Sequence, residues 1–187
     1  MQNKTRDMVY IGLFIVVLTI CAWISVPTAI PFSLGTFGVF LAVLVLGGKR
    51  GSLAVLVYIL LGCIGVPVFS GFRGGLGALL GYTGGYIVGY LFVSLVMWGT
   101  ERWWSGTQEK KCGIRRQWGQ VISMLFGLVV CYAFGTAWFV IAYASEIGAV
   151  GVTAVLGWCV LPYIIPDLIK MWLAVILSKR LRKALRE

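Results

Sequence analysis

The chain has 187 residues, enough for one domain, and 60% of them are hydrophobic while 12% are charged. Soluble domains have roughly 45–50% apolar and about 25% charged residues, so much of this chain must face lipid. The net charge of +10 does not indicate a nucleic-acid partner. The basic residues stand between apolar runs or at the chain ends, and not in a stripe interleaved with aromatic residues.

The sequence contains no histidine, which excludes Ser-His-Asp triads and histidine metal sites. Five cysteines are scattered without a CxxC pair, at Cys21, Cys63, Cys112, Cys131 and Cys159. Cysteines in such a pattern usually serve as small buried apolar side chains and not as disulfide or metal ligands. We therefore predict no catalytic residue, no metal site and no cofactor.

Six apolar segments are candidate membrane spans, at residues 8–26, 33–47, 51–65, 77–98, 118–143 and 152–178. A spanning helix needs about 20 residues, so the second and third either lie partly inside a bundle or extend into their flanking loops. The last segment contains Pro162 and Pro166, which we expect to break it into a leading segment and a final helix that Pro166 opens. We predict an all-α integral membrane protein, with one domain over residues 1–187 and six spanning helices.

Basic residues cluster in alternate connections of this arrangement. They lie in the N-terminal tail, at 47–51, in the polar stretch 99–117 and in the C-terminal tail, whereas 27–32, 66–76 and 144–151 contain only Arg73. Cytoplasmic loops carry the excess of Lys and Arg. We therefore expect a multi-pass protein of the inner membrane with both termini in the cytoplasm.

Charge is nearly absent from the spans themselves, apart from Asp167 and Lys170 after Pro166. A spacing of three places the two side chains on one helix face. One interpretation is an ion pair at a helix start that only satisfies itself, with Lys170 reaching the interface. The other is a polar patch in a pocket open to the outside. We favour it because both residues lie near the outer end of the final helix, and because apolar residues could fill a purely structural role at similar or lower energy.

A glycine-rich stretch runs from Gly65 to Tyr86 and holds Arg73 as its one charge. Dense glycine allows tight turns and close backbone approach. Arg73 either meets a ligand carboxylate or is solvated. Tyr82, Tyr86 and Tyr163 either line an apolar pocket near the polar residues or simply pack.

Three motifs closely resemble the BioY family, the biotin-specific substrate-binding (S) components of energy-coupling factor transporters. They are Gly65-Val-Pro-Val-Phe-Ser-Gly, Gly74-Gly-Leu-Gly-Ala-Leu-Leu-Gly-Tyr-Thr-Gly-Gly-Tyr and Leu161-Pro-Tyr-Ile-Ile-Pro-Asp-Leu-Ile-Lys. The likeness runs from about Pro31 to Ala174. It implies a six-helix component that captures biotin, with a transmembrane coupling (T) subunit and two cytoplasmic ATPases as partners. The chain has no GxxxxGK[ST] motif of its own, so ATP hydrolysis would come from those partners.

The resemblance also implies a site. Asp167 and Lys170 would bind the ureido ring of biotin, and Arg73 or another donor in 66–76 would hold its carboxylate. The full set of candidate ligand-binding residues is Asp167, Lys170, Arg73, Gly74, Gly75, Tyr82, Thr83, Tyr86 and Tyr163. The alternatives are an S component for another vitamin or related carboxylate, a ligand-free structural subunit, and a membrane enzyme, against which the lack of histidine argues.

Overall fold

The computed structural model describes residues 2–26, 32–105, 113–147, 157 and 160–184. Its long helices are α1 Gln2–Trp23, α2 Gly35–Leu46, α3 Gly48–Cys63, α5 Gly84–Ser105, α6 Gly113–Ile147 and α8 Leu161–Ala184. Two shorter helices, η1 Ser70–Phe72 and α4 Leu76–Leu80, lie between α3 and α5. The strands β1 Ser25–Val26 and β2 Phe32–Ser33 pair antiparallel after α1.

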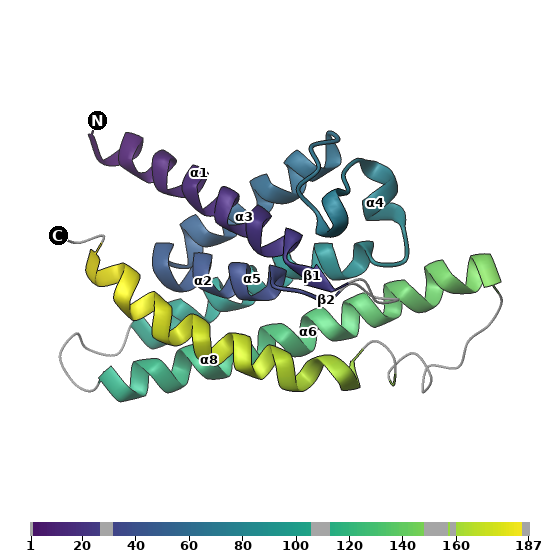
Figure 1. Ribbon diagram of the computed structural model, residues 1–187. Helices are drawn as coiled ribbons and strands as arrows, with labels where there is room; N and C mark the ends of the chain where they lie inside the picture. Colours follow the sequence, from purple (N-terminus) through teal and green to yellow (C-terminus); the bar gives the residue numbers. More distant parts are fainter. Residues whose placement is uncertain (1, 27–31, 106–112, 148–156, 158–159, 185–187) are drawn as a thin grey trace.

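Helix α2 forms the buried centre of the bundle. It packs against α1, α3, α5 and α8, and Val39, Phe40 and Ala42 have no exposed surface. A helix that is apolar on every side is stable only when neighbours cover it. This explains why the second apolar segment is too short for an ordinary span: it lies inside the bundle (Figure 1).

The outer helices carry apolar side chains on the surface. Examples that are more than half exposed are Met8, Leu13, Val16, Phe126, Ile141 and Trp172. Soluble monomers rarely expose apolar patches of this extent. Within the described residues, Lys4–Trp23, Gln117–Ala142 and Leu161–Lys183 are long and apolar enough to cross a membrane. The chain is thus a helical membrane protein, and the part that the structure describes adds the short antiparallel pair β1–β2.

The expected break at Pro166 is wrong, because α8 runs from Leu161 through Pro166 without interruption. Pro162 lies in the first turn, where a backbone N–H has no helical partner. Pro166 has no N–H to donate to the carbonyl of Pro162, so the helix loses one hydrogen bond close to its end. Pro162 thus lies where helices tolerate proline best, whereas Pro166, in the second turn, costs the helix this one hydrogen bond without ending it.

The fourth apolar segment is divided, because α4 ends at Leu80 and α5 begins at Gly84. A methyl group at Gly84 would overlap the carbonyl of Leu79, so this close approach requires glycine. Helix α5 then continues to Ser105, through the first part of the predicted polar loop. Its carboxylate at Glu101 accepts a hydrogen bond from the first N–H of α3, at Gly48.

The start of α1 and the end of α8 lie at the same end of the bundle (Figure 1). Polar contacts at this end converge on the turn between α2 and α3. Arg50 forms an ion pair with Asp7 at 2.7 Å, and Arg182 donates to the carbonyl of Leu44. This end of the bundle is therefore held by charged side chains.

Candidate functional site

Asp167 and Lys170 form a buried ion pair on the face of α8 that meets α2. The Lys170 Nζ lies 2.7 Å from the Asp167 Oδ1. The two residues are 3% and 5% exposed, so both charges are removed from solvent. Burial on this scale is costly unless further hydrogen bonds satisfy both groups.

Residues from three other elements supply those hydrogen bonds. Thr36 Oγ1 donates to Asp167 Oδ1 at 3.0 Å, and the Tyr132 hydroxyl donates to Asp167 Oδ2. Lys170 Nζ donates to the carbonyl of Ser33 at 2.7 Å and to Thr36 Oγ1 at 3.3 Å. The pair is thus the centre of a network that joins β2, α2, α6 and α8.

The start of α2 has a local geometry suited to this network. The Ser33 Oγ accepts a hydrogen bond from the Gly35 N–H at 3.2 Å, which fixes the chain as it enters the helix. Thr36 follows in the first turn, where the helix dipole is positive. The Asp167 carboxylate therefore lies where a negative charge is favoured, and the Ser33 carbonyl is left to accept from Lys170.

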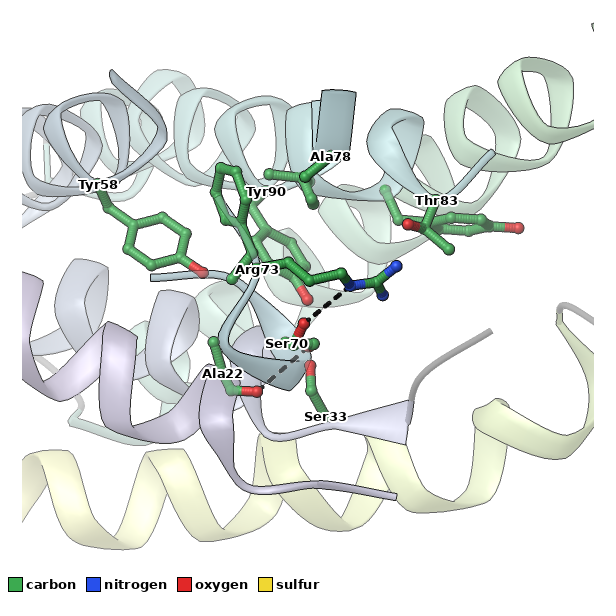
Figure 2. Close-up of a pocket in the computed structure, with 11 residues that line it drawn as sticks. Ala22, Ser33, Tyr58, Ser70, Arg73, Ala78, Thr83 and Tyr90 are labelled. Carbon is green, nitrogen blue, oxygen red and sulfur yellow. Dashed lines mark hydrogen bonds between the residues drawn. The ribbon is translucent and has the colours of Figure 1, made fainter. Parts of the chain in front are cut away.

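A pocket lies beside the network, at the end of the bundle where α1 finishes (Figure 2). It contains about 480 Å³ of space between atoms, part of it open to the surroundings. The described residues that line it are Ala22, Ser33, Tyr58, Phe69, Ser70, Arg73, Ala78, Thr83, Tyr86, Ile87 and Tyr90. Ser33 belongs to both the pocket and the network, so it connects the two.

The loop 66–73 covers one side of the pocket and is tied to the end of α1. The Ser70 hydroxyl donates to the carbonyl of Ala22 at 3.2 Å, and Trp23 Nε1 donates to the carbonyl of Pro67 at 2.8 Å. Phe72 packs on Trp23, with ring centroids 4.8 Å apart. The position of this loop therefore depends on the position of α1.

Phe69 anchors the same loop from inside. Its ring is 2% exposed, packs edge-on against Tyr58 at 5.7 Å between centroids, and lies directly over Gly62. Gly75 adopts a φ of 87°, which favours glycine. A methyl group at Gly74 would overlap the carbonyl of Val66. The glycines thus allow the two arms of the loop to lie close together.

Arg73 is the one charged side chain among the described residues that line the pocket. It is exposed, and its Nε donates to the carbonyl of Ser70 at 3.2 Å. Figure 2 shows the guanidinium group reaching from the loop towards the part of the pocket where Thr83 lies. A guanidinium in this position is suited to a carboxylate ligand.

The candidate residues from the sequence occupy three places. Arg73, Thr83 and Tyr86 line the pocket, Asp167 and Lys170 form the adjacent network, and Gly74 and Gly75 shape the loop. Two other tyrosines surround Phe139 instead: the Tyr82 ring lies edge-on to it at 6.0 Å, and Tyr163 packs in its cluster. A role for any of these residues in ligand binding stays a prediction.

Sequence reasoning missed five polar residues near the network or in the pocket: Ser33, Thr36, Tyr58, Tyr90 and Tyr132. Each of the three tyrosines places a hydroxyl within an apolar segment. Such a hydroxyl needs a polar partner, and that requirement is the signal that was available.

Comparisons with known proteins agree with one another. The family model described as the BioY family matches residues 1–187. A "Probable biotin transporter BioY" of Pyrococcus horikoshii is 36% identical over 96% of this chain and 98% of its own length. The "Biotin transporter BioY" of Thermotoga maritima is 38% identical, over 95% and 96% respectively.

A solved structure is similar throughout. It is the crystal structure of "the S-component for biotin from an ECF-type ABC transporter", with a TM-score of 0.78 and 26% sequence identity. The similarity covers 97% of this chain and 93% of the other. With a match over its whole length in sequence and nearly its whole length in structure, the chain described here belongs to the BioY family.

Proposed function

We propose that this chain captures biotin for uptake across the inner membrane, as the S component of an energy-coupling factor transporter. The observation that carries the proposal is the buried Asp167–Lys170 pair beside a pocket with an arginine at its edge. The names of its relatives support biotin as the ligand.

The chemistry of the site matches the three parts of biotin. The ureido ring has two N–H donors and one carbonyl acceptor, so the Asp167 carboxylate and the Lys170 ammonium can bind it together. The sulfur-containing ring and the aliphatic chain suit a pocket walled by Tyr58, Phe69 and Ile87. A ligand bound in this way would present the carboxylate at its other end to Arg73.

We propose further that α1, α2, α3, α5, α6 and α8 are the six spans, with both termini in the cytoplasm. The clusters of basic residues at both chain ends support this orientation. So does the position of both helix ends on one side of the bundle (Figure 1). The pocket lies at the opposite end, beside Ala22 at the end of α1. In the proposed orientation its opening would face the outside of the cell.

Transport in this proposal also requires partner subunits. The sequence has no GxxxxGK[ST] motif, and the similar solved structure is described as part of an ABC transporter. A T subunit in the membrane and two cytoplasmic ATPases would therefore supply the energy, and this chain would act as a binding protein rather than an enzyme.

The test is titration calorimetry of the detergent-purified protein with biotin. Asp167→Asn keeps the side-chain size and removes the charge, so we expect at least about tenfold weaker binding, since a hydrogen bond to a charged group is worth roughly 1.5–3 kcal/mol. Asp7→Asn is the matched control, because it makes the same change in an ion pair with Arg50 at the far end of the bundle.

Two results would contradict the proposal. If the parent and Asp167→Asn bind biotin with equal affinity, the Asp167–Lys170 pair does not bind the ligand. Preference for another vitamin in competition titrations, or no binding of any vitamin, would favour a different S component or a ligand-free subunit.

A further inference from the structure

Tyr90 lies between the pocket and the buried ion pair. Its ring comes from α5 and lines the pocket (Figure 2). Ser33, the residue whose carbonyl accepts a hydrogen bond from Lys170, lines the same pocket. Asp167, Lys170 and Thr36 are not among the described residues that line the pocket. On this side of the pocket, Tyr90 and Ser33 are therefore the hydroxyl-bearing lining residues that lie next to the pair.

A glycine on α2 makes this position possible. A methyl group at Gly35 would lie 2.5 Å from the Tyr90 Oη and 3.0 Å from two of its ring carbons. The phenol thus rests directly on the first turn of α2, one residue before Thr36. With any larger residue at 35, the hydroxyl would be displaced from its place beside the network.

The two observations together assign a role to Tyr90. A phenol hydroxyl both donates and accepts, so it can bind either the carbonyl or an N–H of a cyclic urea. We propose that Tyr90, resting on Gly35, is a specificity-determining residue whose hydroxyl binds the polar ring of the ligand next to the Asp167–Lys170 pair. This inference rests on the proposed function, since it takes biotin as the ligand.

The test compares Tyr90→Phe, Gly35→Ala and the double variant by titration calorimetry in detergent. Tyr90→Phe removes only the hydroxyl, and the loss of one neutral hydrogen bond corresponds to about two- to tenfold weaker binding. Gly35→Ala displaces the same hydroxyl and gives a similar loss. The double variant binds biotin no more weakly than whichever single variant has the lower affinity, because both changes remove the same contact.

Two comparisons make the result specific. Tyr10→Phe is the matched control, because Tyr10 lies beside Arg6 on α1 and does not line the pocket; its affinity for biotin stays at the parent value. Desthiobiotin carries the ureido ring without the sulfur. Tyr90→Phe should therefore weaken biotin and desthiobiotin by the same factor.

The outcomes separate this inference from the proposed function. If the parent binds biotin and Asp167→Asn does not, while Tyr90→Phe binds like the parent, the role of Tyr90 is wrong and the biotin site stands. A loss restricted to biotin would place Tyr90 against the sulfur and overturn the assignment. So would a loss seen only together with a lower melting temperature of the ligand-free variant, which marks a packing role. A parent that binds no biotin overturns both.

Discussion

Replacing Lys170 by methionine tests how strongly the buried pair depends on both of its members. The change removes the hydrogen bonds that Lys170 donates to Asp167 Oδ1 at 2.7 Å, to the Ser33 carbonyl at 2.7 Å and to Thr36 Oγ1 at 3.3 Å. The Asp167 side chain, 4% exposed, keeps its donors Thr36 and Tyr132 but loses its counter-charge.

The expected loss of stability follows from the burial of the remaining charge. Breaking a buried pair by removing one partner costs about 3–5 kcal/mol. For a chain of this size one kcal/mol corresponds to roughly 2–4 °C, so we expect a melting temperature lower by roughly 6–20 °C. Combining Lys170→Met with Asp167→Asn removes both charges and should recover much of the loss.

The measurement is thermal unfolding of the ligand-free protein in detergent, followed by a thiol-reactive dye. Cys21 and Cys131 are buried in the folded state and react on unfolding. Lys179→Met is the control, because it makes the same substitution at an exposed position of α8. If Lys170→Met melts with the parent, or if the double variant is the less stable one, the account of a compensated buried charge is incorrect.

Two substitutions around the loop 66–73 test the pocket. Arg73→Ala should weaken biotin by about three- to tenfold and leave biotin methyl ester unaffected, because only a carboxylate forms a charge-assisted bond with the guanidinium; an equal effect on both ligands in calorimetry would exclude that contact. Gly62→Ala should destabilise the protein by about 1–3 kcal/mol and weaken biotin binding, because its methyl group would displace the buried ring of Phe69. Gly99→Ala is the control, because Gly99 is exposed and has no neighbour within 4 Å; it should change neither the stability nor the affinity for biotin. If Gly62→Ala behaves like the parent in the same assays, the ring of Phe69 moves freely.

Local patterns predicted the features that depend on neighbouring residues. The spacing of Asp167 and Lys170 predicted that they share a helix face, and the ion pair at 2.7 Å agrees. The short apolar segment 33–47 left two alternatives, a helix partly inside a bundle or one that extends into its flanking loops, and α2 is the first of these. Both inferences use only the period of the helix and the length needed to cross a membrane.

The partners of the pair come from far along the chain and leave no local pattern. Thr36 is 131 residues from Asp167, and Ser33 is 137 residues from Lys170. The course of α8 through Pro166 was also missed. Proline rules apply strictly in a helix interior, whereas this proline lies near a helix start that the sequence does not mark.

The location of both charges on one helix has a consequence for how the protein enters the membrane. Each charge at the centre of an inserting helix costs about 2.5–3.5 kcal/mol on translocon scales. Because Asp167 and Lys170 are one turn apart on α8, they can neutralise each other as soon as that helix forms. Helix α8 can then insert into the bilayer with its two charges already paired, before Thr36 of α2 and Tyr132 of α6 donate their hydrogen bonds to Asp167. A pair divided between two helices would leave each one carrying an uncompensated charge during biogenesis.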